Sequence, residues 1–176
     1  SGDGIVFKGD VGPWYNPING DYHLKRDSAK ELISLAVETY KKSNHGTSPS
    51  ELFIHAKTSF NDDEWDGFSD AVDSTTNLVG VKIRSSSDIK LYRQGDMPIL
   101  RGVAYSRSRF SGYLWTRGFV PRLQTYPGME VPNPIEIDIC KGFAELRTVF
   151  TDILALTKLN YNACIYGDGI PVTLKF

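Results

Sequence analysis

Apolar and polar positions follow two periods along this chain, and the longer period predicts three helices. An apolar stripe with helical spacing predicts a helix over 29–43, and the sequence SAKE, which begins at Ser28, fits a capping box at its start. A second helix is expected over about 62–73, where Asn61 can cap the first turn. A third helix is expected over roughly 144–159.

Short apolar runs predict strands between these helices. The sequence IEIDIC at 135–140 alternates with period two, as a half-buried strand does. The proline- and glycine-rich segment 10–24 predicts no regular element. Further strands are expected over 4–9, 52–55, 78–84, 89–93 and 172–176, with two more inside 97–106 and 112–118. Strands interleaved with helices in a chain of 176 residues predict one α/β domain built on a single sheet.

Composition narrows the class of protein further. Hydrophobic residues make up 40% of the chain and charged residues 23%, which is typical of a folded domain. No apolar run approaches the roughly 18 residues of a membrane-spanning helix, and the start of the chain does not resemble a signal peptide. Cys140 and Cys164 are the only cysteines, and Asn-x-Ser/Thr sequons are absent. We therefore expect a cytoplasmic protein without a membrane partner.

Positive charge is concentrated in the middle of the chain. Residues 82–122 contain nine Lys/Arg and two Asp, a net charge of +7, whereas the whole chain carries −1. Such a band favours a polyanionic partner, of which nucleic acid is the commonest. The alternative is a set of strand surfaces whose charges are paired with acids from elsewhere in the fold.

The residues that usually carry catalysis are sparse. The loop after the predicted 52–55 strand, where α/β proteins often place their chemistry, holds His55, Ala56 and Lys57 and no carboxylate before the next helix. The acids of NDDEWD suit the first turn of that helix. Glu136 and Asp138 share one face of a predicted strand, which we expect to be solvated. The chain has no phosphate-binding loop, no CxxC pair, no GxSxG elbow and no histidines with metal-ligand spacing.

Three long stretches can be compared with known families, namely VGPWYNPINGDYHLKRDSAKELISLA, ELFIHAKTSFNDDEWDGFSDAV and ELRTVFTDILALTKLNYNACIYGDGIPVTLKF. Together they resemble the PIWI domain of prokaryotic Argonaute proteins. The segment between the last two, PILRGVAYSRSRFSGYLWTRGFVPR, is similar to strands that line the guide–target channel. The resemblance covers nearly the whole chain in the family's order. It implies an RNase H-like fold, with a mixed central sheet flanked by helices. It also implies that residues 1–176 form a single PIWI domain fragment that lacks the first strands and the C-terminal end.

The resemblance also predicts whether the chain cleaves nucleic acid. Cleaving members hold two divalent metals with an Asp-Glu-Asp-Asp or Asp-Glu-Asp-His tetrad. The first position lies on a strand that we expect to be absent, the second matches no residue, and the fourth would follow Phe176. The third falls at Ala56 or Lys57, neither of which can bind Mg²⁺ or Mn²⁺. We therefore expect no catalytic residue, no metal and no cofactor. Lys57 would be a fixed cation beside the scissile phosphate or a surface lysine without a role.

Binding to a guide–target duplex needs no tetrad, because cations can contact regularly spaced phosphates while base pairing reads the sequence. The resemblance places phosphate contacts at the end of the last helix, on the final strand, and on the middle strands and loops. By position these contacts are Lys158, Asn160, Lys175, Arg117, Arg107, Arg109 and Arg122.

The resemblance leads to one main functional hypothesis and two alternatives. The main hypothesis is a nucleic-acid-binding module of a non-cleaving Argonaute that acts in guide-directed silencing and prokaryotic defence. Its partners would be a guide oligonucleotide, a complementary target strand of RNA or DNA, the remaining Argonaute domains and an associated effector. The alternatives are an active metal-dependent nuclease whose acids lie in the missing segments, and a protein-interaction domain that has kept the fold without binding nucleic acid.

Overall fold

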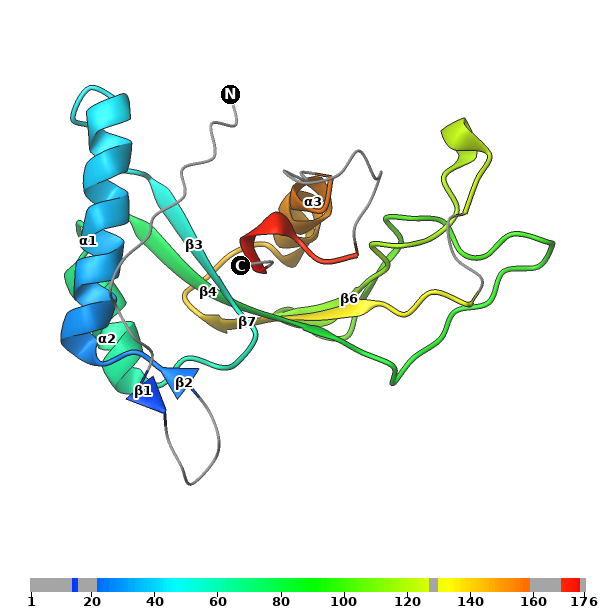
Figure 1. Ribbon diagram of the computed structural model, residues 1–176, viewed down its shortest axis with the longest axis horizontal. Helices are drawn as coiled ribbons and strands as arrows, with labels where there is room; N and C mark the ends of the chain where they lie inside the picture. Colours follow the sequence, from blue (N-terminus) through cyan, green and yellow to red (C-terminus); the bar gives the residue numbers. More distant parts are fainter. Residues whose placement is uncertain (1–13, 16–21, 127–129, 159–168, 175–176) are drawn as a thin grey trace. The chain divides into compact units, whose positions relative to one another are not determined.

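The computed structural model describes residues 14–15, 22–126, 130–158 and 169–174 (Figure 1). The chain divides into two compact units, which are described separately. The first consists of Ser1–Phe53 with Thr58–Val79, and the second of Ile54–Lys57 with Gly80–Phe176.

The first unit is built on two helices, α1 (Arg26–Ser43) and α2 (Asp62–Asp70), with the two-residue strands β1 (Trp14–Tyr15) and β2 (Tyr22–His23) paired antiparallel before them. Helix α1 buries Ala29, Ile33 and Val37, which are spaced four residues apart on one face. The helices approach closely at Gly67, where an added Cβ would lie 2.2 Å from the backbone oxygen of Arg26. Only a residue without a side chain allows this packing.

The sheet has the strand order β3-β4-β7-β6-β5. Its strands are β3 (Glu51–Ala56), β4 (Asn77–Ser85), β5 (Ala104–Ser106), β6 (Ser111–Leu114) and β7 (Ile135–Lys141). Strand β7 pairs antiparallel with both β4 and β6, and β6 pairs antiparallel with β5. Two short 3-10 helices complete the second unit, η1 (Pro121–Leu123) and η2 (Val172–Leu174).

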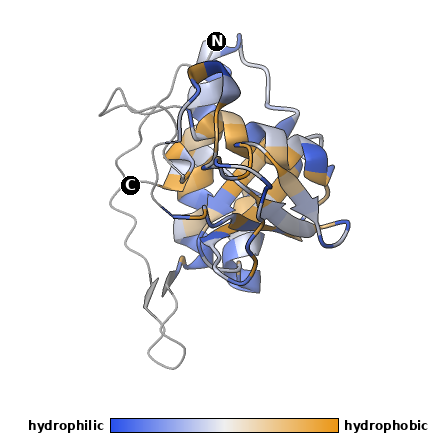
Figure 2. Cartoon of the chain, turned by 90° about the vertical axis from the view of Figure 1, so that its right-hand side faces the viewer, coloured by the Kyte–Doolittle hydropathy of each residue, from blue (hydrophilic) through white to orange (hydrophobic). Residues whose placement is uncertain are grey.

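The strand register gives the sheet one apolar and one polar face. Ile137 of β7 lies opposite Ile83 of β4 and Gly112 of β6. A Cβ on Gly112 would lie 2.8 Å from the ring of Phe150, so this face packs against α3 (Leu146–Leu156) (Figure 1). The other face carries polar pairs in the same register. Coloured by hydropathy, the helices show both apolar and polar residues, as expected for elements with one buried side (Figure 2).

The longer predicted elements are confirmed. The three helices form, and the predicted strands over 52–55, 78–84 and 135–140 appear as β3, β4 and β7, each extended by one or more residues. The Asn61 cap is also confirmed, because its side-chain oxygen accepts a hydrogen bond from the backbone N–H of Glu64 at 2.7 Å. The strand expected over 4–9 lies outside the described residues.

Several local predictions are wrong. Helix α1 begins earlier than expected, with Lys25 at the N-cap, so Ser28 lies inside its first turn and forms no capping box. The predicted strand over 89–93 has no strand pairing, because Ile89 and Leu91 pack on the buried Trp115 cluster instead. Residues 172–174 form a 3-10 turn, closed by a hydrogen bond from Leu174 N–H to Pro171 oxygen, where a final strand was expected. The segment 10–24 contains β1 and β2, although no regular element was expected.

In the described part of the chain, no helix combines the length and the apolar character needed to cross a membrane.

Candidate nucleic-acid interface

The end of β3 is the place where the family resemblance puts a catalytic carboxylate. Here His55 and Ala56 are half-buried, and Lys57 is exposed. Nδ1 of His55 lies 2.8 Å from the hydroxyl of Thr173 in η2, a hydrogen bond that joins β3 to the last described turn. Burial lowers the pKa of His55 to about 4 from its usual 6.5, so the ring is neutral at pH 7. Neither Ala56 nor Lys57 supplies an oxygen ligand, so these residues do not fit a divalent metal.

The acids that follow β3 have structural roles in α2. Asp62, Asp63 and Glu64 occupy the first turn of the helix, where its dipole favours negative charge. Glu64 is buried, with its carboxylate 3.3 Å from Nδ1 of His23 and accepting a hydrogen bond from the N–H of Leu24. Among the described residues, no group of three or more His, Cys, Asp or Glu side chains has the arrangement of a metal site.

Arg101 connects the end of β6 to the end of α3. Its guanidinium donates to the backbone oxygen of Thr116 at 2.8 Å and to the hydroxyl of Thr157 at 2.6 Å. Both threonines are buried, and burial lowers the pKa of Arg101 below its ordinary value. Arg117 and Lys158 are the next residues after these two threonines, and both are exposed. The half-buried Arg101 thus bonds to the residue directly before each of two predicted phosphate contacts, Arg117 and Lys158.

Gly169, which precedes η2, contacts both Thr116 and Arg117. The hydroxyl of Thr116 donates to the backbone oxygen of Gly169 at 2.6 Å. A Cβ on Gly169 would lie 2.6 Å from Nε of Arg117, so the arginine side chain passes over this glycine. The signal for this arrangement in the sequence is weak. Arg101 is one basic residue among the nine of residues 82–122, and threonines at element ends are common.

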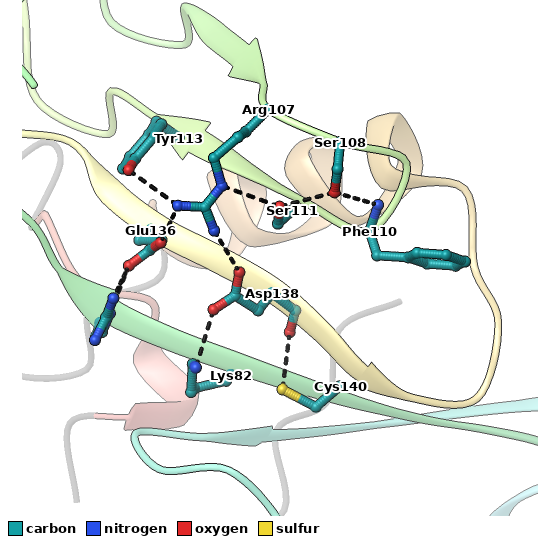
Figure 3. A network of polar contacts seen from close by, with 10 residues as sticks. Lys82, Arg107, Ser108, Phe110, Ser111, Tyr113, Glu136, Asp138 and Cys140 are labelled. Atoms are coloured by element: carbon teal, nitrogen blue, oxygen red, sulfur yellow. Dashed lines mark hydrogen bonds and ion pairs between the residues drawn. The ribbon is translucent and has the colours of Figure 1, made fainter.

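The polar face of the sheet holds a network of ion pairs (Figure 3). Glu136 accepts hydrogen bonds from Arg84 at 2.5 Å and lies 2.9 Å from Nη1 of Arg107. Asp138 pairs with Lys82 at 3.0 Å and with Arg107 at 3.3 Å. The hydrogen bond to Glu136 raises the pKa of Arg84 above its ordinary value.

This network corrects one prediction about the two acids of β7. They do share a face of the strand, but Glu136 is only 1% exposed, whereas a solvated side chain was expected. Two arginines from the neighbouring strand and hairpin cover it. The expectation that Arg107 contacts nucleic acid stays a prediction, although its charge is shared between two carboxylates.

The remaining predicted contacts occupy different surroundings. Arg109 lies over the rings of Phe110 and Phe143. Arg122 is exposed within η1, directly after Pro121. Asn160 and Lys175 lie outside the described residues. Arg101 thus links the chain just before Arg117 to the chain just before Lys158, and all seven nucleic-acid contacts stay predictions.

Comparison with known proteins gives matches only at the level of structure. No protein-family model matches the sequence, and no curated protein matches it at a significant level. Clostridium butyricum Argonaute, solved with a guide DNA and a 19-mer target DNA, matches with a TM-score of 0.67 and 15% identity over 88% of this chain. A. aeolicus Argonaute matches with a TM-score of 0.55 and 19% identity over 82%. Aa-Ago with externally bound siRNA matches with a TM-score of 0.54 and 17% identity over 82%.

These matches cover 20% of each Argonaute chain, so this chain spans about a fifth of their length. The matched part includes most of the sheet-and-helix arrangement described above. TM-scores of 0.54–0.67 show a shared fold, and at identities of 15–19% they show the fold alone. The chain therefore shares its mixed α/β fold with these Argonaute structures, which fits the RNase H-like fold that its sequence resemblance implied.

Proposed function

We propose that this chain is the nucleic-acid-binding module of a guide-directed, Argonaute-type protein, and that it holds a guide paired with its target without cleaving the target. The observation that carries this proposal is a run of 33 residues, 97–129, with five arginines and no acidic residue. The chain that contains this run shares its fold with Argonaute structures, one of which was solved with guide and target DNA.

The chemistry of duplex binding fits the arrangement around Arg101. A duplex presents phosphates at regular spacing, so cations fixed relative to one another can contact successive phosphates. Arg101 fixes the starting points of Arg117 and Lys158 through hydrogen bonds to Thr116 and Thr157. Because these hydrogen bonds already order the backbone there, the conformational entropy lost on binding is mainly that of the two side chains.

The absence of cleavage is proposed from the residues at the end of β3. By the resemblance, the third aspartate of cleaving members would fall at Ala56 or Lys57, and His55 beside them is neutral and bonded to Thr173. A bound duplex would meet an ammonium group at this point. Under this proposal the protein works in the cytoplasm in guide-directed silencing and prokaryotic defence, and an associated effector and further Argonaute domains supply the remaining steps.

Fluorescence anisotropy with a labelled guide–target duplex at low and moderate salt tests the proposal. We expect affinity to fall steeply as salt rises, and Arg117→Gln and Lys158→Gln each to reduce the slope of log K against log salt by about 0.9, the value for one lost phosphate contact. Lys30→Gln is the matched control, since it removes one exposed charge from α1. A folded chain that does not bind at low salt, or a slope unchanged in both variants, would refute the proposal.

The same samples separate the two alternatives. An active nuclease would shorten the labelled target strand once Mg²⁺ or Mn²⁺ is added, and Asp62→Asn and Asp63→Asn would abolish that activity if a displaced carboxylate carried it. A protein-interaction domain would leave the duplex unbound and would tolerate glutamate at both Arg117 and Lys158. The proposed module binds the duplex and leaves the target strand intact with either metal.

A further inference from the structure

An exposed cluster at the tip of the β5–β6 hairpin combines one cation with two aromatic rings. The guanidinium of Arg109 lies 4.8 Å from the ring centre of Phe143 and 5.6 Å from that of Phe110. Phe143 is 53% exposed and Phe110 is 42% exposed, which is unusual for apolar side chains of this size. We call these three residues the Arg109 platform.

Hydrogen bonds of the hairpin hold the platform in place. The backbone N–H groups of Arg107 and Ser108 both donate to the oxygen of Ser111, and the hydroxyl of Ser108 accepts from the N–H of Phe110 at 3.1 Å. The oxygen of Phe110 accepts from the N–H of Ile139 in β7 at 2.8 Å. The ring of Phe110 projects away from the ion-pair network of the sheet (Figure 3).

The register of β6 and β7 explains how Phe143 reaches this hairpin. Ser111 lies opposite Asp138, so residues that precede Ser111 lie beside residues that follow Asp138. Strand β7 ends at Lys141, and Gly142 turns the chain with a φ of 72°, a conformation that favours glycine. The platform is thus formed by two loops whose backbones are fixed by the sheet.

Charge distinguishes Arg109 from the arginine two positions before it. Arg107 is neutralised by Glu136 and Asp138. Within the part of the chain that the structure describes, the contacts of Arg109 are with the two rings and not with a carboxylate. Its positive charge therefore remains available to a ligand, while the rings limit the positions that the guanidinium adopts.

The ligand that suits this surface is both flat and anionic. A cation held against exposed aromatic rings is the combination that proteins use to stack single-stranded bases and pair with their phosphates. Bases inside a duplex already stack on each other and offer no free face, so a paired segment would leave the rings unused.

We propose that the Arg109 platform binds an unpaired nucleotide, with its base stacked on the phenylalanine rings and its phosphate paired with Arg109. This inference rests on the proposed function, because it assigns to the same protein a contact with the single-stranded part of a bound guide or target.

The test compares a blunt duplex with the same duplex carrying a single-stranded thymidine overhang at the 3′ or the 5′ end, each measured by anisotropy with the full chain. We expect at least one overhang to increase the affinity of the wild type. Phe143→Leu, which keeps an apolar side chain but removes the aromatic face, should lose about tenfold or more on that probe and nothing on the blunt duplex. Arg109→Gln should weaken binding of that probe more than binding of the blunt duplex. Tyr92→Leu is the matched control, since Tyr92 is an 80% exposed aromatic residue of another loop.

The outcomes separate this inference from the proposed function. If the wild type binds the blunt duplex but gains nothing from an overhang, or if Phe143→Leu behaves like Tyr92→Leu, the platform does not hold a nucleotide and the duplex-binding proposal stands. If the wild type binds neither probe at low salt, both proposals are wrong.

Discussion

Replacing Glu136 by glutamine tests whether the buried ion pairs of the sheet stabilise the fold. The carboxylate is held by Arg84 on one oxygen and Arg107 on the other. A glutamine has the same shape, but its amide oxygen can accept from only one arginine, while its NH₂ group faces a second donor. The substitution thus removes one charge-assisted hydrogen bond and weakens another, a loss of about 1.5–3 kcal/mol in the free energy of unfolding. Both arginine side chains are about half exposed and can turn to water, so the larger cost of a stranded buried charge is avoided.

Urea denaturation followed by circular dichroism and tryptophan fluorescence measures this loss. Asp138→Asn is the matched control, because it makes the same chemical change on the same strand at a more exposed carboxylate, and we expect it to cost about 1 kcal/mol. The double variant with Arg107→Gln should be less destabilised than the sum of the two single variants, since both remove the same contact. An unfolding midpoint of Glu136→Gln equal to that of the wild type would show that the ion pairs of Glu136 do not stabilise the sheet. A larger loss in Asp138→Asn would refute the reasoning that the more buried carboxylate contributes more.

Three further predictions follow from local structure. The pKa of His55 is lowered to about 4, so between pH 6.5 and 4 the unfolded chain binds a proton that the folded chain does not. The free energy of unfolding therefore falls as pH drops through this range. Urea midpoints at several pH values should show this fall weakened in His55→Gln; identical pH dependence in both proteins would contradict it. Gly67→Ala places a methyl group against the backbone oxygen of Arg26 and should cost about 1–3 kcal/mol, seen as a lower melting temperature, whereas an unchanged value would mean that α1 and α2 separate freely. Asn61→Ala removes the cap of α2 and should lower the free energy of unfolding in urea by about 1 kcal/mol. Ser28→Ala should lower it much less, because Lys25 and not Ser28 is the N-cap of α1. Equal losses in the two variants would mean that Ser28 does cap the helix.

Features that depend on residues close together in the sequence could be predicted. Features that depend on strand register could not. Asn61 and its helix, and the alternation of β7, are visible within a few residues. The burial of Glu136 depends on arginines that the pairing of three strands brings together, and alternation reveals a shared face without revealing what covers it.

The same limit applies at the start of α1 and in the candidate interface. The SAKE pattern is a good local match for a helix start, but packing against α2 near Gly67 extends the helix to Arg26. Likewise, the basic band showed many cations and could not show which of them are paired. That Arg101 bonds to Thr116 and Thr157 depends on how β6 and α3 end in space.

The ion pairs on the sheet also determine what a distant polyanion encounters. Lys82, Arg84 and Arg107 are each close to a carboxylate, so their fields largely cancel beyond a few ångströms. Within the run 97–129, the field that extends into solvent then comes from the arginines other than Arg107. Such a field raises the rate of encounter and orients the approaching molecule before any contact forms. Under the proposed function, the two acids of β7 therefore affect the rate of association, because they cancel the attraction of the cations beside them.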